Sequence, residues 1–249
     1  MQEGFTTAFA NWKQYAVSVS LNGKEIRSNA GSKEKVFDLQ AAKIEQATMS
    51  LADVLATDAY SDGTGNGSKD ITGLAAMIET TPGTTAYMSV PVGNTAWVNQ
   101  VQTSVGAAAV NLLPKMRTLI NDCNEGVGAA ASKADFVLTT QTAHEAFEAI
   151  VFPMVRYAPN PSGGADAGVD KLKFKGTVVE WSSYCTSGVM FVLNSKHTTL
   201  FVHKDANFSM AEGGFRRPIN QDALTAQILV QLNLCCDNRR KFGKLTGIS

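Results

Sequence analysis

The longest run of helical periodicity in the chain stops at a segment that no helix can continue. Over residues 33–60 the apolar positions recur at steps of four and three, which places one stripe of side chains along an α-helix: Phe37, Ala41, Ile44, Thr48, Leu51 and Leu55. Such a helix would be roughly 40 Å long, and Ser32 is its expected N-cap. Residues 61–70 then read SDGTGNGSKD, a composition that ends helices.

The segment before this helix, residues 5–28, has the alternation of a strand. The pair Asn22-Gly23 favours a tight turn, with a short return strand through residues 25–27. A hairpin of this size is not stable alone, so it must lie on its own sheet or on a neighbouring chain, and both alternatives remain open. Edge-strand addition to a neighbour would use its apolar and aromatic residues, which gives four candidate inter-subunit contacts: Phe9, Trp12, Tyr15 and Val17.

The rest of the chain mixes helical and extended patterns. A helix within residues 104–124 is either kinked at Pro114 or begins near Asn111. The last third is rich in strand patterns, and in residues 228–236 the even-numbered positions are apolar. Other strands are expected at 172–174, 177–181, 189–193 and 199–202. Because helices and strands follow without regular βαβ alternation, the sequence predicts an α+β fold.

Composition narrows the class of protein. The chain has 22 basic and 22 acidic residues, whereas proteins that bind nucleic-acid backbones usually carry a basic excess. No apolar run reaches the roughly 18 residues of a membrane span, and the N-terminus lacks the pattern of a secretory signal. The cysteines at 123, 185, 235 and 236 form no CxxC pair, which favours reduced thiols in a cytosolic chain.

No motif has the spacing of an active site. The segment from Asp62 opens like a calcium loop but places Gly73 where a bidentate glutamate is needed. His144, His197 and His203 lack the spacing of zinc ligands, and no nucleophile elbow occurs. We therefore expect no catalytic, cofactor-binding or metal-binding residue. A rival class, a small α+β enzyme, would require a pocket in which these histidines or Cys185 converge with shifted pKa values.

Several segments, in this order, resemble the major capsid proteins of tailed phages, which have the HK97-like capsid fold. The long helix is followed by DGTG at 62–65 and TGL at 72–74. Further on, FVLTTQTAHE at 136–145 resembles a strand-then-helix step of that fold, and LKFKGTVV at 172–179 resembles its strand, glycine and valine segment.

The resemblance implies a division of the chain. Residues 1–28 would be the returning half of the extended loop, so the family's N-terminal arm and outgoing strand would be missing, through trimming, processing or a compact design. Residues 29–87 and 204–240 would form the peripheral domain, with the spine helix at 33–60. Residues 88–203 and 241–249 would form the axial domain.

The implied function is that of a structural subunit, not an enzyme. It would assemble with itself, as pentamers and hexamers, into the icosahedral shell of the virion, in the host cytoplasm. Scaffold, portal or decoration proteins are possible partners, contact with packaged DNA would be non-specific, and neither a membrane nor a cofactor is implied. Some members cross-link a loop lysine to an asparagine; Lys13, Lys24 and Asp237 could take such roles, but Val230 falls near the expected asparagine, so we expect no cross-link. The alternative within the fold is an encapsulin-like compartment, and a monomeric partner-binding domain is a third option.

Overall fold

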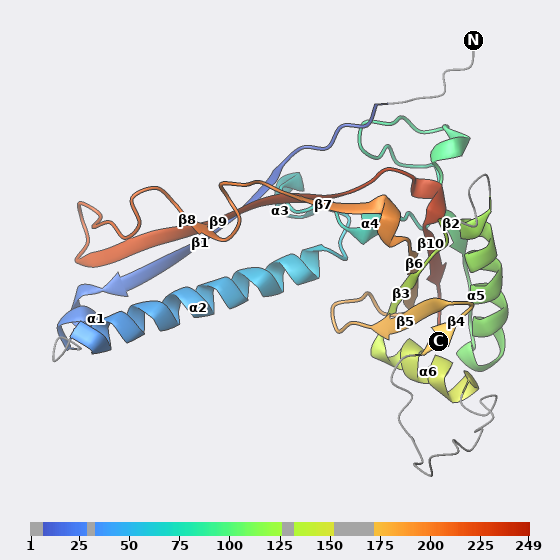
Figure 1. The fold of residues 1–249 in the computed structure, drawn as a ribbon, viewed down its shortest axis with the longest axis horizontal. Helices are drawn as coiled ribbons and strands as arrows, with labels where there is room; N and C mark the ends of the chain where they lie inside the picture. The colour runs from blue at the N-terminus through green and yellow to red at the C-terminus, as the bar shows by residue number, and fades with distance from the viewer. Residues whose placement is uncertain (1–6, 29–32, 126–131, 152–171) are drawn as a thin grey trace. The chain divides into compact units, whose positions relative to one another are not determined.

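A computed structural model describes residues 7–28, 33–125, 132–151 and 172–249. The chain divides into two compact units (Figure 1): a first unit of residues 1–10, 74–199 and 235–249, and a second unit of residues 11–73 and 200–234. These boundaries differ from those of the predicted domains. The expected N-cap, Ser32, lies outside the described residues.

The second unit combines a long helix with a sheet (Figure 1). Helix α2 covers Lys33–Asp58, which confirms the predicted long helix and its end before the glycine-rich segment. Strand β1 (Lys13–Asn22) pairs antiparallel with β9 (Ala223–Cys236) along its whole length. Among the described strands the order is β1-β9-β7, with β7 at Thr198–Val202, and β8 (Ser209–Met210) also pairs with β9. The chain passes from the first unit to the second within β7, after residue 199, and returns to the first within β9, after residue 234.

One face of this sheet packs against α2. The buried cluster consists of Val19, Leu51, Ile71, Ile228, Val230 and Leu232, and partly buried Tyr15, Val17, Ile44 and Leu55 pack around it. Each fully buried aliphatic side chain contributes about 1.5–3 kcal/mol to folding. The even-numbered apolar face predicted for residues 228–236 is confirmed as far as residue 232, since Ile228, Val230 and Leu232 are buried. Beyond it the alternation ends, because Asn233 and Cys235 are buried as well and Leu234 is only partly buried.

The predicted N-terminal hairpin is wrong. After Asn22 the chain enters helix α1 (Gly23–Ser28), so residues 25–27 are helical. Asn22 Oδ1 accepts a hydrogen bond from Lys24 N at 3.2 Å, which is how asparagine caps a helix start rather than making a hairpin turn. The strand finds its partner in β9 instead, and the Glu25 carboxylate pairs with Lys43 Nζ of α2 at 2.5 Å.

The described strands of the first unit form a mixed six-stranded sheet in the order β2-β10-β6-β3-β5-β4. The pairs β2–β10 and β3–β5 are parallel and the others are antiparallel. The bounds are Gln100–Gln102 for β2, Phe136–Thr139 for β3, Lys173–Phe174 for β4, Thr177–Trp181 for β5, Val189–Leu193 for β6 and Gly243–Thr246 for β10.

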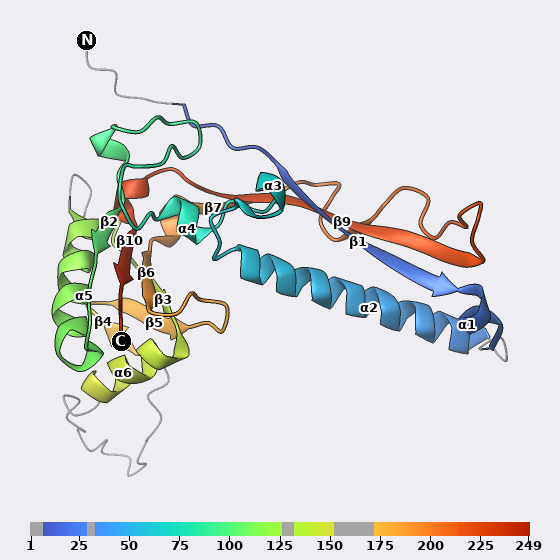
Figure 2. The ribbon, with the colours of Figure 1, turned by 180° about the vertical axis from the view of Figure 1, so that it is seen from behind.

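Helices α5 (Ala108–Asn124) and α6 (Gln141–Val151) cover this sheet (Figure 2). Their inward residues join a cluster with the strands that includes Leu112, Met116, Leu119, Phe147, Met190 and Val192. Pro114 lies inside α5, so the alternative of a start near Asn111 is wrong. The short helical turns are α3 (Gly65–Ser68), α4 (Leu74–Met77), η1 (Thr95–Trp97), η3 (Ser195–His197) and η4 (Arg239–Lys241). None of the described helices has the length and hydropathy to cross a bilayer.

Candidate inter-subunit surface

The glycine-rich turn after α2 holds β1 and β9 in place within the second unit. Tyr15 Oη of β1 donates to Asp58 Oδ2 at 2.8 Å and accepts from Ile71 N at 2.7 Å. Asn233 Oδ1 of β9 accepts from Thr72 N at 3.0 Å. A side chain at Gly73 would place its Cβ 2.5 Å from the backbone oxygens of Asp58 and Ala59, so only glycine fits between the helix end and this turn.

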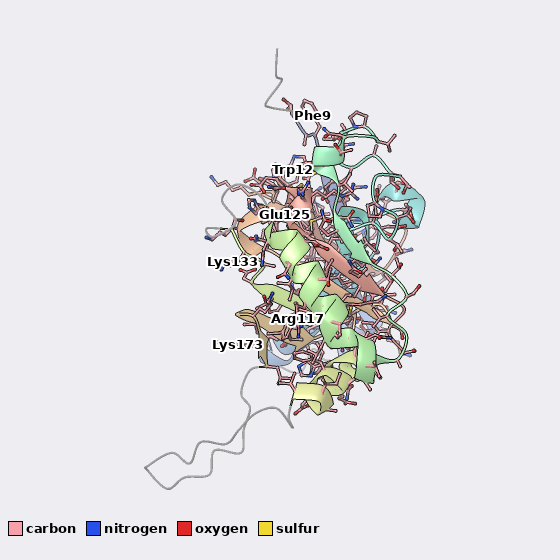
Figure 3. All side chains as sticks on the ribbon, turned by 90° about the vertical axis from the view of Figure 1, so that its right-hand side faces the viewer. Phe9, Trp12, Arg117, Glu125, Lys133 and Lys173 are labelled. Carbon is pink, nitrogen blue, oxygen red and sulfur yellow. The ribbon has the colours of Figure 1, made fainter. Side chains whose placement is uncertain are left out.

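The four predicted contact residues fall into two groups. Tyr15 and Val17 lie in β1 and pack against the buried cluster of their own unit. Phe9 and Trp12 precede β1 and their side chains lie at the surface (Figure 3), 67% and 49% exposed. The structure therefore uses Tyr15 and Val17 within the subunit, whereas Phe9 and Trp12 are accessible to a neighbour.

A further set of exposed apolar residues lies in β7, the strand next to the residue that Trp12 contacts. The Trp12 ring lies edge-on to the ring of His203, with the centroids 5.6 Å apart, and His203 directly follows β7. In β7, Leu200, Phe201 and Val202 are 53%, 50% and 39% exposed, so both faces of this strand are open. We call Trp12, Leu200, Phe201 and Val202 the β7 patch. Sequence reasoning missed β7 as a surface because a consecutive apolar run there indicates a strand but not whether it is buried.

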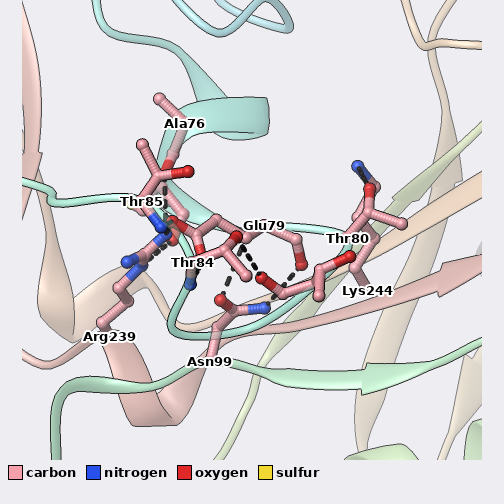
Figure 4. Close-up of polar contacts among 10 residues, drawn as sticks. Ala76, Glu79, Thr80, Thr84, Thr85, Asn99, Arg239 and Lys244 are labelled. Carbon is pink, nitrogen blue, oxygen red and sulfur yellow. Dashed lines mark hydrogen bonds and ion pairs between the residues drawn. The ribbon is translucent and has the colours of Figure 1, made fainter. Parts of the chain in front are cut away.

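The first unit holds a buried ionic cluster (Figure 4). Arg239, 1% exposed, pairs with the buried Glu79 carboxylate at 3.1 Å and donates to the carbonyl oxygens of Met77 and Ala76 at 2.6 and 2.9 Å. The guanidinium also lies 5.0 Å from the centroid of the Tyr87 ring. Glu79 in turn accepts hydrogen bonds from the backbone N–H groups of Thr84 and Thr85. This cluster fixes the loop that follows α4 and forms no binding site of its own.

The polar residues singled out in the sequence form no metal site. In the described part of the chain no three His, Cys, Asp or Glu side chains gather as metal ligands. Asp62 Oδ1 instead accepts from Thr64 N and Oγ1 at 3.0 and 2.7 Å, and these bonds lower the pKa of Asp62. That geometry is an ordinary Asx turn.

The cysteines are packed in the interior. Cys123, Cys185, Cys235 and Cys236 are all buried and unbridged. Burial raises the pKa of Cys185 to about 11 and that of Cys236 to about 12. A reactive thiol needs a lowered pKa, so Cys185 does not behave as the nucleophile that the rival enzyme class would need.

Solved structures match the fold although sequences do not. No family model matches the chain, and no curated protein does either. The structure of the cyanophage A-1(L) capsid asymmetric unit matches with a TM-score of 0.70 and 15% identity, over 95% of this chain and 77% of that one. The chain has the HK97-like capsid fold. Mycobacterium phage Adephagia matches with a TM-score of 0.55 and 14% identity, over 94% of this chain and 71% of that one.

A compartment protein shares this fold. The holo-SrpI encapsulin complex of Synechococcus elongatus PCC 7942 matches with a TM-score of 0.54 and 11% identity, over 96% of this chain and 74% of that one. These matches confirm the predicted α+β class and the capsid fold. At such identities the likeness shows the fold alone.

Proposed function

We propose that this chain is a major capsid protein, a structural subunit that assembles with copies of itself into the icosahedral shell enclosing the DNA of a tailed phage. The observation that supports this is the match to the cyanophage A-1(L) capsid over 95% of the chain at a TM-score of 0.70. The subunit performs this structural role by packing against its neighbours in the virion, after assembly in the host cytoplasm.

The predicted domains have distinct roles in this shell. Residues 29–87 and 204–240 form the peripheral domain along α2, residues 88–203 and 241–249 form the axial domain of pentamers and hexamers, and residues 1–28 belong to the extended loop. The second unit of the structure, with α2 and the long β1–β9 pair, supports the peripheral assignment. The six-stranded sheet with α5 and α6 supports the axial one.

Contacts between subunits involve Phe9 and the β7 patch. Leu200 and Val202 point to the same face of β7, neighbouring exposed apolar side chains favour an interaction surface, and aromatic side chains dominate the energy of such contacts. Tyr15 and Val17 act indirectly. They pack β1 against the buried cluster of the second unit, and Trp12 directly precedes this strand.

Contact with packaged DNA is weak and non-specific. The chain carries 22 basic and 22 acidic residues. The exposed charges around α5 have mixed sign, with Glu125 and Lys133 toward one end of the labelled face and Arg117 and Lys173 toward the other (Figure 3). Such a surface lacks the basic excess that binds phosphates strongly. Scaffold, portal and decoration proteins are the further partners of the assembled shell.

The encapsulin-like compartment is the second candidate, favoured by the match to the Synechococcus elongatus complex. Particles purified from an infected or expressing host separate the two roles. Nuclease-resistant DNA inside closed icosahedral particles supports the phage shell, whereas DNA-free particles holding a co-purified protein cargo support the compartment. Absence of any closed particle in negative-stain images contradicts both.

A further inference from the structure

A serine, a histidine and an aspartate of the first unit form a continuous hydrogen-bonded chain. Ser132 Oγ, just before β3, lies 2.5 Å from His197 Nε2, at the end of η3. On the other side of the ring, His197 Nδ1 lies 2.6 Å from Oδ1 of Asp237, the residue after β9. A hydroxyl in reach of a base, with a third group orienting that base, is the arrangement that activates a serine nucleophile.

The surrounding bonds fix the direction of each proton. The Asp237 carboxylate can only accept, so it holds the proton on Nδ1 and leaves Nε2 as the acceptor for the Ser132 hydroxyl. Asn194 is buried, and its Nδ2 donates to Ser132 Oγ at 3.1 Å while its Oδ1 accepts from Lys196 N. A further bond at 3.3 Å, from Asp237 N to His197 O, ties the aspartate to the histidine backbone.

The site is accessible from solvent. The side chain of His197 is 21% exposed and that of Asp237 is 70% exposed, and Ser132 is half-buried. An open site of this kind suits a small substrate that needs few binding contacts.

We propose that Ser132 is an activated nucleophile that takes up the acyl group of small esters, with His197 as base and Asp237 as the positioning residue. Ser132 Oγ bonds to the ester carbonyl carbon while its proton moves to His197 Nε2. The carbon–oxygen bond to the alcohol then breaks and the alkoxide takes that proton. Water repeats both steps on the acyl-serine, which releases the carboxylic acid and restores the hydroxyl. Asn194 Nδ2, which donates to Ser132 Oγ, fixes the position of the attacking oxygen.

The test is labelling of the full chain by a fluorophosphonate, which bonds to an activated serine and releases fluoride. Ser209 is the internal control, because its hydroxyl donates to the carbonyl oxygen of Asp205 and, among the described residues, bonds to no histidine or carboxylate. We expect Ser132 to be labelled about 100-fold faster than Ser209, the scale of general-base catalysis, as measured by mass spectrometry of the peptides. Equal labelling of the two serines overturns the proposal.

Variants assign the roles. Ser132→Ala should abolish the fast label, and His197→Gln should slow it about 100-fold. Because Asp237 is exposed, Asp237→Asn should leave the fold intact while slowing the label, and Asp237→Glu should restore part of the rate. A wild-type rate in folded His197→Gln or in Asp237→Asn overturns the mechanism. Labelling needs no assembled particle, so failure here leaves the shell function untouched.

Discussion

The buried guanidinium of Arg239 shows how much one residue can determine in the first unit. Removing it leaves the Glu79 carboxylate, 8% exposed, without its cation. Breaking a buried ion pair in this way costs about 3–5 kcal/mol, so Arg239→Ala should lower the free energy of unfolding by that amount in urea titrations. Arg240, whose ion pair with Glu125 is exposed, is the matched control, and Arg240→Ala should cost less than about 1 kcal/mol. Equal losses would contradict the role of burial.

Tyr15 makes stability depend on pH in a defined direction. Burial raises the pKa of Tyr15, the hydrogen bond from the Ile71 N–H lowers it by a smaller amount, and the Asp58 carboxylate adds to the rise. The folded chain therefore keeps a proton that the unfolded chain loses above about pH 10. Tyr15 stabilises the fold below that pH, and this contribution is lost as pH rises beyond it.

Comparison with Tyr15→Phe isolates this effect. At pH 8 the wild type should be more stable by about 1–2 kcal/mol, because the variant loses the bonds to Asp58 and Ile71. The difference should shrink between pH 10 and 11.5 in denaturant titrations. A difference that stays constant over this range would show that the Tyr15 hydroxyl is not desolvated.

Residue-level roles were only partly predictable from the sequence. Alternation correctly marked Tyr15 and Val17 as apolar strand positions, but alternation does not say whether the covering surface belongs to the same subunit. An arginine such as Arg239 reads as exposed because most arginines are. Ser132, His197 and Asp237 come from three distant segments, so no local motif could indicate their contact.

Among the elements, the junction after α2 depends on a glycine. At Gly73 an added Cβ meets backbone oxygens at 2.5–2.6 Å, which cannot rotate away, so Gly73→Ala should destabilise the fold by about 1–3 kcal/mol. At Gly65 the obstacle is the end of the Asp70 side chain, which can move, so Gly65→Ala should change stability by less than about 0.5 kcal/mol. Thermal unfolding of both variants measures the two losses of stability, and losses of similar size would contradict the steric argument.

Element types followed from periodicity where the pattern was long. The helix over residues 33–58 and the strand over residues 228–232 each bury one face, and that burial is what periodicity reports. The predicted hairpin was wrong because it depended on a short local signal. Asn22-Gly23 is a local turn signal, whereas the pairing of β1 with β9 depends on contacts distant in the sequence, and these outweigh local propensity.

For the whole molecule, assembly should depend on the β7 patch while folding does not. Leu200 is 53% exposed, so Leu200→Asp should alter the stability of the subunit by less than about 0.5 kcal/mol. A charge buried in a subunit contact is costly, so the same variant should lower the fraction of protein in large particles at least tenfold. Leu200→Met, which keeps the apolar surface, is the control and should assemble normally. Sedimentation gives the fraction, and normal assembly of Leu200→Asp would exclude this patch from the contact.

The most direct test of the shell function is the mass of the purified chain by light scattering over a range of concentrations. The account predicts pentamers, hexamers or closed shells, with a mass many times that of one chain. A monomer at every concentration would contradict it.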